Sequence, residues 1–147
     1  MSELSRTLST LTTEAANPDW AEIDTWPTAR LAAGMIDADR GLYEAVAACT
    51  DAITAAVDGI VARLSRGGRL IYLGAGTSGR LGVLDASEIP PTYGTDPSLV
   101  VGVIAGGDVA IRHAVENAED DVVAGASAVA DLGVGEADVV VGIASSG

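Results

Sequence analysis

Hydrophobic residues recur at helical spacing in one long stretch of the chain. Between residues 37 and 66 they follow one another at steps of three and four, which lines them along one face of a helix. These positions are Leu42, Val46, Cys49, Ile53, Val57, Ile60 and Leu64. We therefore predict one helix over residues 37–66, ended by Gly67 and Gly68, with Cys49 in the core that this face buries.

Three later segments are apolar at nearly every position, which predicts buried strands. They are RLIYL at 69–73, LVVGVI at 99–104 and DVVVGIA at 138–144. Strands that are apolar on both faces suit a parallel sheet covered by helices. Because helical segments lie between them, we predict an α/β fold with a doubly wound, mostly parallel sheet.

The helices of this sheet have recognisable start and stop signals. A short helix is expected from Arg80 to about Glu88, ended by the Pro90-Pro91 pair. Another is expected from Asp108 to about residue 119, with Asp108 as its N-cap. A third, rich in alanine, covers about 121–132.

The N-terminal region differs from the rest of the chain. Residues 1–27 mix Ser, Thr, Asn and Pro with Trp20 and Trp26, and they show no clear period. We therefore expect residues 1–36 to form an N-terminal arm with a short helix. Residues 37–147 are expected to form the α/β domain.

Composition limits the partners and the location. The 147 residues can bury one ordinary core. A net charge of −13 opposes binding to nucleic acid or to an anionic membrane surface. The single cysteine excludes an internal disulfide, and no segment approaches the roughly 20 apolar residues that span a bilayer. Since the N-terminus also lacks a signal-peptide pattern, we expect a soluble, cytoplasmic protein without nucleic-acid or membrane partners.

A glycine-rich loop, GAGTSG at 74–79, separates the first strand from its helix. Its spacing matches dinucleotide-binding loops, but these place an acidic residue at the end of the next strand, where residues 105–107 are Ala-Gly-Gly. The hydroxyls of Thr77 and Ser78, with Arg80 close by, instead suit a terminal phosphate at a helix N-terminus. The alternative is a tight turn that needs glycine only for its backbone conformation.

The candidate ligand contacts come from two loops. Thr77, Ser78 and Gly79 follow the first strand, and Ser145 and Ser146 follow the third. The two serines reach the same ligand if the first and third strands are neighbours. An ordinary polar turn is the alternative for this second loop.

Three segments resemble the N-acetylmuramic acid 6-phosphate etherase family. They are GAGTSGRLGVLDASEIPPTYG at 74–94, IAGGDVAIRHAVENAEDD at 104–121 and DVVVGIASSG at 138–147. The resemblance implies a sugar isomerase (SIS) type α/β domain, a homodimer, a sugar-phosphate substrate, and no metal or nucleotide cofactor. Because members of the family continue past this last motif, it also implies a domain truncated at its C-terminus.

The resemblance implies a reaction that yields N-acetylglucosamine 6-phosphate and D-lactate. Opening the sugar to its aldehyde acidifies the C2 hydrogen, so a base can remove it while an acid protonates the departing lactate, and water then adds. The resemblance assigns the acid to Glu88 and the base to Glu119. A helix C-terminus, where Glu88 is predicted, favours a protonated carboxyl group. Glu116 and His113 are the alternatives to Glu119.

Two other functions share this type of domain. A regulatory SIS domain binds a sugar phosphate without converting it, and an aldose–ketose isomerase removes the same proton but needs no acid for a leaving group. The presence of both carboxyl groups, and of the D-A-S-E-x-P-P-T segment, favours the etherase. An inactive fragment is the remaining alternative.

Overall fold

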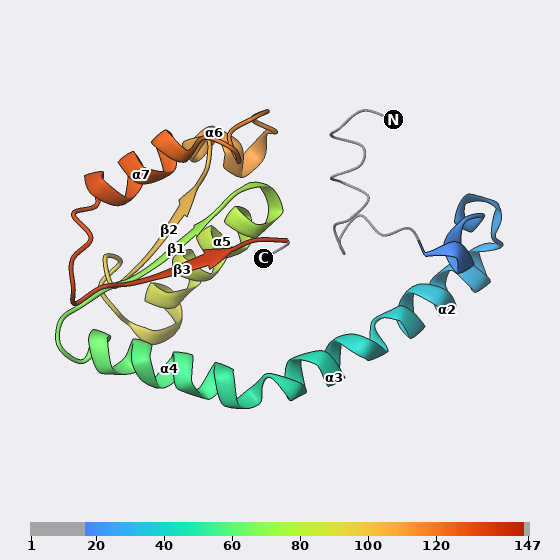
Figure 1. Cartoon of the computed structure of the whole chain (residues 1–147), viewed down its shortest axis with the longest axis horizontal. Helices are drawn as coiled ribbons and strands as arrows, with labels where there is room; N and C mark the ends of the chain where they lie inside the picture. The colour runs from blue at the N-terminus through green and yellow to red at the C-terminus, as the bar shows by residue number, and fades with distance from the viewer. Residues whose placement is uncertain (1–16, 146–147) are drawn as a thin grey trace. The chain divides into compact units, whose positions relative to one another are not determined.

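The computed structural model of the chain describes residues 17–145 (Figure 1). These residues divide between Ala56 and Val57 into two compact units. Regular structure begins with two short 3-10 helices, η2 (Pro18–Trp20) and η3 (Ile23–Thr25). Three α-helices then follow in the order α2 (Thr28–Ala38), α3 (Arg40–Ala48) and α4 (Thr50–Leu64).

Two tryptophans organise the start of the first unit. The ring centroids of Trp20 and Trp26 lie 5.5 Å apart, and the guanidinium carbon of Arg30 lies 4.0 Å from the Trp26 centroid. A Cβ atom on Gly34 of α2 would lie 3.2 Å from the Trp26 ring. The aromatic side chains of the arm therefore pack on α2, where a small residue leaves room for them.

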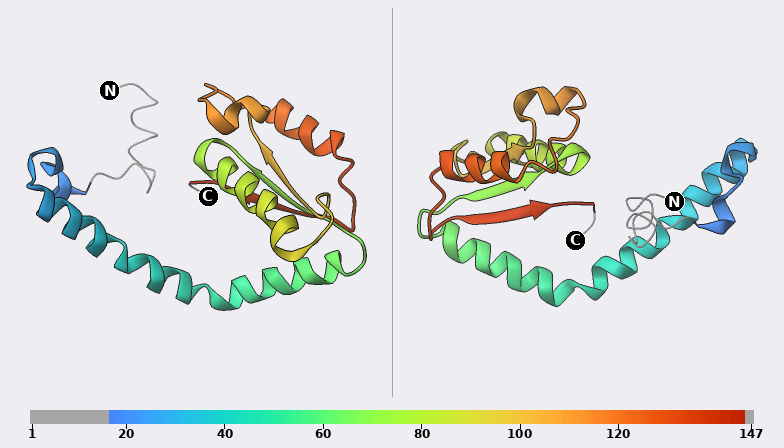
Figure 2. Two further views of the ribbon diagram at one scale, coloured as in Figure 1. Left: turned by 180° about the vertical axis from the view of Figure 1, so that it is seen from behind. Right: turned by 45° about the horizontal axis from the view of Figure 1, so that its top comes forward.

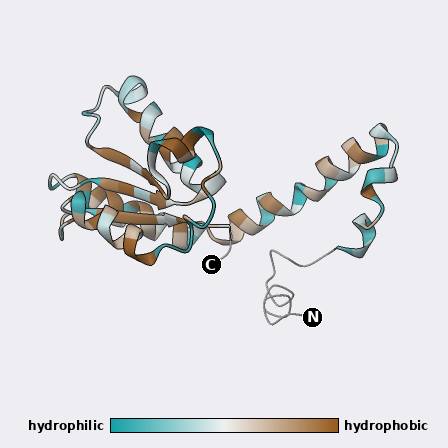
Figure 3. Ribbon diagram, turned by 90° about the horizontal axis from the view of Figure 1, so that it is seen from above, coloured by the Kyte–Doolittle hydropathy of each residue, from teal (hydrophilic) through white to brown (hydrophobic). Residues whose placement is uncertain are grey.

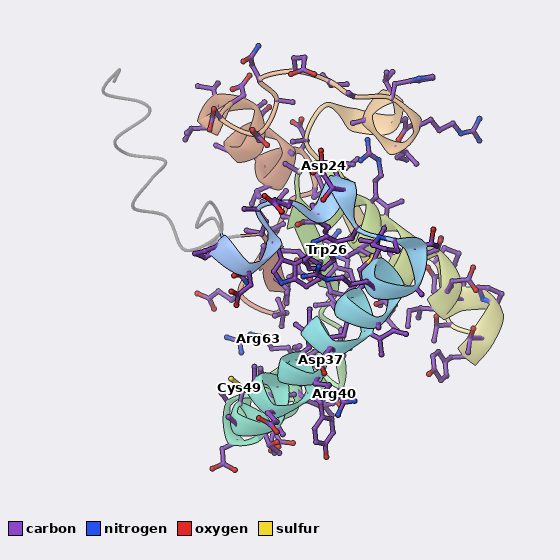
Figure 4. All side chains as sticks on the ribbon, turned by 90° about the vertical axis from the view of Figure 1, so that its right-hand side faces the viewer. Asp24, Trp26, Asp37, Arg40, Cys49 and Arg63 are labelled. Atoms are coloured by element: carbon purple, nitrogen blue, oxygen red, sulfur yellow. The ribbon has the colours of Figure 1, made fainter. Side chains whose placement is uncertain are left out.

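The helix predicted over residues 37–66 is interrupted at Cys49. This residue ends α3 with φ −95° and ψ 7°, and the Thr50 hydroxyl donates to the carbonyl of Ala47 at 2.6 Å before α4 begins. The prediction that Cys49 lies in the core is wrong, because its side chain is exposed (Figure 4). Helical spacing predicted that these residues are helical, but it could not predict whether another part of the protein covers their apolar side chains.

Most of these apolar side chains have no cover in the part of the chain that the structure describes. Hydrophobic segments alternate with hydrophilic ones along these helices (Figure 3). Only Ile60 and Leu64, in the last turns of α4, pack against the core of the second unit. Four other members are between 46% and 62% exposed: Leu42, Val46, Ile53 and Val57.

No single helix within residues 17–145 is both long and apolar enough to cross a membrane. Two adjoining stretches, Thr28–Ala48 and Thr50–Leu64, reach that length and composition only when they are taken together across a bend.

The second unit is built on a parallel sheet whose strands match the prediction to within one residue at each end. The strands are β1 (Leu70–Gly74), β2 (Val100–Ile104) and β3 (Val139–Ile143). Their order is β2-β1-β3, so the first and third strands are neighbours (Figure 2). The predicted α/β fold with a parallel sheet is confirmed.

Helix α5 (Gly76–Tyr93) is longer than predicted at both ends. It includes the first helical turn over residues 76–79, and it continues through Pro90 and Pro91 to the left-handed Gly94. The two prolines cost hydrogen bonds in the last turns. Ala86 and Ile89 nevertheless pack in the core cluster with β1 and β2, so burial on the sheet keeps the helix intact past the prolines.

Glycines let α5 lie unusually close to the sheet. A Cβ atom on Gly79 would lie 2.6 Å from the carbonyl oxygen of Gly74, at the end of β1. One on Gly102 of β2 would lie 2.6 Å from the Cα of Val83. Real Cβ atoms do not approach other atoms this closely, so the contact between helix and strands requires glycine on both sides.

The opposite face of the sheet carries α7 (Val122–Asp131), as Figure 2 shows. Helix α6 (Gly107–Arg112), directly after β2, contacts both β2 and α5. The predicted N-cap of α6 was wrong: Asp108 lies in its first turn, and the cap is Gly106 in the left-handed region with φ 86°. A Cβ atom there would lie 2.9 Å from Val115, so space as well as backbone conformation favours glycine. The predicted start of α7 is confirmed, because Asp121 is its N-cap.

An ion pair joins β1 and β3 at the edge where the strands begin. Arg69 donates to both carboxylate oxygens of Asp138, at 3.2 Å from Nε and 2.8 Å from Nη2, and also to the carbonyl of Leu132 at 2.9 Å. Hydrogen bonds from Arg69 and from the backbone of Gly135 hold the pKa of Asp138 well below its usual range. This pair fastens the end of α7 and the start of β3 to β1.

The close contact of α5 predicts a specific sensitivity. Gly79→Ala should destabilise the chain by about 1–3 kcal/mol, because the added methyl group would overlap the Gly74 carbonyl. Gly59→Ala is the matched control, since a Cβ atom at Gly59 of α4 meets nothing within 4 Å, and it should stabilise by roughly 0.5–1 kcal/mol. Urea unfolding measures both changes. Equal midpoints for the two variants would contradict the close contact.

Candidate functional site

The strand order indicates which edge of the sheet is the candidate ligand site. The chain passes from β1 to β2 on one side and then to β3 on the other side of β1. The carboxyl ends of β1 and β3 therefore lie side by side. In open parallel sheets this switch point, at the carboxyl ends of the strands, is where ligands bind. The glycine-rich loop and Ser145 lie there.

The N-terminus of α5 has unused hydrogen-bond donors. The cap residue, Ala75, has no side chain that could accept from the first turn. The first backbone bond of the helix runs from the Gly79 N–H to the Ala75 carbonyl, at 3.0 Å. The N–H groups of residues 76–78 therefore have no partner within the helix. Donors at the positive end of a helix are typical of an anion site, and the site predicted from the glycine-rich sequence stays a prediction.

The predicted phosphate contacts of this loop differ in exposure. Thr77 is exposed, Ser78 is half-buried and Gly79 is buried in its contact with β1. Gly76 has φ 53°, a left-handed conformation that turns the chain into the helix. Ser78 is the one of the three predicted contacts that lines the main cavity of the site.

The main cavity, of about 1270 Å³, lies between α7 and the carboxyl ends of the strands. Three predicted site residues line it, one from each of three separate segments: Ser78, Glu119 and Ser145. Gly106 and Gly107, after β2, also border it. The remaining wall is formed by apolar and small residues of the sheet and of α7. An apolar pocket with a few converging polar groups is typical of a small-molecule site.

The sequence predicted a helix that ends at about Glu119, and this prediction is wrong. Helix α6 ends at Arg112, and Glu119 is exposed in the loop that leads to α7. This loop also borders a second, smaller cavity of about 200 Å³, which both Glu119 and its alternative Glu116 line. His113, the other alternative, lines the smaller cavity as well. All three candidate bases therefore face the same region.

Arg80 has a different role from the one predicted. Its Nε donates to the carbonyl of Ile111 at 3.0 Å, and its Nη2 donates to the carbonyl of His113 at 3.3 Å. The guanidinium group thus holds the end of α6 and is not a free phosphate contact. Sequence spacing could not reveal this role, because the partners are backbone atoms more than 30 residues away.

Glu88 lies apart from the other candidates. It is exposed on α5 and lines neither cavity. Because α5 continues to Tyr93, the predicted place of Glu88 at a helix end is wrong. Leu81 and Leu84, two turns and one turn earlier on α5, are 55% and 58% exposed. Glu88 therefore shares its helix face with apolar side chains that nothing within residues 17–145 covers.

The half-buried phenol of Tyr72, on β1, faces this part of α5. Burial, and then a hydrogen bond to Asp85, raise the pKa of Tyr72 to about 12. Its hydroxyl group therefore stays protonated near neutral pH and acts as a donor, not as a base.

The last predicted ligand contact, Ser146, lies outside the described residues.

Among the residues that the structure describes, no group of three or more His, Cys, Asp and Glu side chains is arranged to hold a metal ion. The absence of a metal or nucleotide cofactor stays a prediction.

Comparisons with known proteins point to one family and one kind of relative. Residues 52–147 match the family described as glucokinase regulatory protein N-terminal SIS domain. Proteins named N-acetylmuramic acid 6-phosphate etherase from Jannaschia sp. (strain CCS1) and Escherichia coli (strain SMS-3-5 / SECEC) are 56% and 54% identical over 140 residues. A third, from Caldanaerobacter subterraneus subsp. tengcongensis, is 50% identical over 141 residues.

These matches cover 95% to 96% of this chain but only 44% to 47% of the three relatives. The chain therefore spans a little less than half the length of the curated relatives it matches.

The cavity geometry predicts the effect of one hydroxyl group. Ser78→Ala should weaken the binding of a phosphate monoester such as N-acetylglucosamine 6-phosphate about fivefold, because one hydrogen bond of about 1 kcal/mol is lost. Ser87→Ala removes a hydroxyl from the same helix that instead donates to the Leu84 carbonyl at 2.8 Å, and it should leave binding unchanged. Calorimetric titration measures both. Equal losses in the two variants would exclude Ser78 as a ligand contact.

Proposed function

The chain belongs to the family of the glucokinase regulatory protein N-terminal SIS domain, and on this premise we propose that it is the N-terminal part of an N-acetylmuramic acid 6-phosphate etherase. The observation that carries the proposal is 50–56% identity to named etherases over nearly the whole chain. The cavity shared by Ser78, Glu119 and Ser145 supports it, since these groups meet at the switch point of the sheet. The proposal assigns the chain to cell-wall sugar recycling in the cytoplasm.

The substrate's phosphate group would bind at the N-terminus of α5. The N–H groups of residues 76–78 and the hydroxyls of Thr77 and Ser78 are its donors. The sugar would extend into the main cavity, whose volume of about 1270 Å³ leaves ample room for an amino sugar with its lactyl group. Ser145, and Ser146 beside it in the sequence, are the proposed contacts on the β3 side.

In the proposed reaction, the open-chain aldehyde form of the sugar loses its C2 proton to the carboxylate of Glu119. The electron pair left at C2 forms a double bond to C3, and the bond from C3 to the lactyl oxygen breaks. Glu88 gives its proton to that oxygen, so D-lactate departs as an alcohol. Water then adds at C3 and a proton returns to C2, which yields N-acetylglucosamine 6-phosphate.

A second function, sugar-phosphate binding without turnover, has one observation in its favour. Glu88, the proposed acid, lines neither cavity in the single chain. A domain that held the ligand through α5 without an acid beside it would bind and not react. Turnover and binding therefore need separate measurements.

We also propose that the chain forms a homodimer through the exposed apolar positions of α3 and α4. A helix face with four large apolar side chains about half exposed is typical of an interface. Leu81 and Leu84 beside Glu88 form another such surface. A second copy that covered this surface would also remove water from around Glu88.

Turnover is tested by incubating the chain with N-acetylmuramic acid 6-phosphate and measuring D-lactate. We expect Glu119→Gln and Glu88→Gln each to lower the rate at least about 100-fold, because each loses a proton-transfer group. Glu136→Gln, an exposed change next to the start of β3, is the matched control and should keep the wild-type rate. Undiminished turnover in Glu119→Gln would refute the assigned base, and binding without any lactate would favour the non-catalytic function.

The interface is tested by sedimentation velocity. The wild-type chain should sediment as a dimer, and Val57→Asp should shift it toward the monomer, because a charge would be buried in the apolar contact. Val122→Asp places the same charge on α7, where Val122 is 82% exposed, and should leave the dimer intact. A monomeric wild-type chain, or equal behaviour of the two variants, would contradict this interface.

A further inference from the structure

We infer that Arg80 is a positioning residue, which locks the loop carrying Glu119 to the helix whose N-terminus receives the phosphate. The inference rests on the proposed function, because it concerns the distance between the phosphate site and the proposed base. The hydrogen bonds from Arg80 to the Ile111 and His113 carbonyls carry it.

These two carbonyls lie at the C-terminus of α6, a helix of only six residues. His113 leaves the helix in an extended conformation, with φ −127° and ψ 154°. Carbonyl groups at a helix end have no partner in a following turn and carry partial negative charge. The planar guanidinium group of Arg80 can donate to both of them at once, from different nitrogens. It therefore fixes the point at which the chain leaves α6.

The position of Arg80 itself is fixed by the packing of α5. The preceding residue, Gly79, is buried against the Gly74 carbonyl of β1, so this turn of the helix cannot shift on the sheet. Arg80 is half-buried, which limits the freedom of its side chain. The guanidinium group thus extends from the most tightly packed part of the site.

The loop after α6 is then held at both ends. Arg80 binds the carbonyl of His113 at its start, and the Asp121 carboxylate accepts from the Ala124 N–H at 2.8 Å at its end, where α7 begins. Between these points Asn117 adopts φ 60°, a left-handed conformation that asparagine adopts more readily than other residues with a side chain. Glu119 lies within this restrained segment.

Arg80 also lines the smaller cavity together with Gly76, Glu116 and Glu119. It is the only Lys or Arg among the residues that line this cavity. One rigid helix therefore supplies the phosphate donors at residues 76–78 and, one turn later, the anchor of the loop that carries the proposed base. A displacement of about 1 Å between such groups can cost about 100-fold in rate without weakening binding.

The inference is tested first without turnover, by ¹⁵N relaxation of the backbone amides. In Arg80→Ala the order parameters of residues 114–120 should fall below about 0.6, from about 0.85 in a rigid loop. Arg80→Lys keeps the charge but not the fork of donors, and should give intermediate values. Arg112→Ala removes an exposed positive charge from α6 itself and should change nothing. Unchanged order parameters in Arg80→Ala, with the signals of β1 preserved, would overturn the inference.

A second measurement follows ligand binding, with N-acetylglucosamine 6-phosphate as the probe. In the wild-type chain the probe should shift the amide signals of residues 76–78 and of 114–120, whereas in Arg80→Ala only the former should shift. A probe that shifts 76–78 but not the loop in the wild-type chain would overturn the coupling. A probe that shifts neither would count against the proposed function, and the relaxation comparison would still decide the role of Arg80.

Kinetics separates positioning from substrate contact. In any preparation that releases D-lactate, Arg80→Ala should lower kcat at least tenfold and change KM by less than about twofold, with partial recovery in Arg80→Lys. An increase in KM alone would make Arg80 a substrate contact and overturn the inference.

Discussion

The close approach of α5 to the sheet is the constraint on which the candidate site depends. Gly79 lies so near the end of β1 that a single methyl group would overlap the Gly74 carbonyl, and Gly102 makes the equivalent contact from β2. This packing fixes the first turn of α5 directly beyond the carboxyl end of β1. The uncapped N–H groups of that turn therefore point to the same edge of the sheet as the loop after β3. The glycines of the loop serve packing as much as backbone conformation.

Arginines fasten the two ends of the sheet in different ways. At the edge where the strands begin, Arg69 binds the carboxylate of Asp138 and joins β1 to β3. At the edge where they end, Arg80 binds backbone carbonyls and holds the loop after α6. The first is an ion pair between two side chains, and it lowers the pKa of Asp138. The second leaves the nearby carboxylates, Glu116 and Glu119, available for chemistry.

Exposed apolar side chains gather on α3, α4 and α5. Apolar positions on α3 and α4, and Leu81 and Leu84 on α5, have no cover within the residues that the structure describes. Burial of apolar surface is the main favourable contribution to folding and association. The proposed second copy would supply that burial for α3 and α4. It would also give Glu88 an environment that the single chain lacks.

The sequence alone determined the elements whose signals are local. Uniformly apolar runs predicted all three strands, because both faces of a covered parallel sheet are buried. The glycine spacing with its hydroxyls predicted the anion site, and motifs that resemble the etherase family assigned Glu88 and Glu119.

Tertiary structure decided what depends on distant partners. Burial on the sheet carries α5 through Pro90-Pro91. Cys49 is exposed because no described residue covers it, and the strand order brings Ser145 to the loop after β1. Arg80 donates to backbone carbonyls, and the sequence does not indicate which ones. Every residue has the same carbonyl group, so only the tertiary structure determines which of them lie near Arg80.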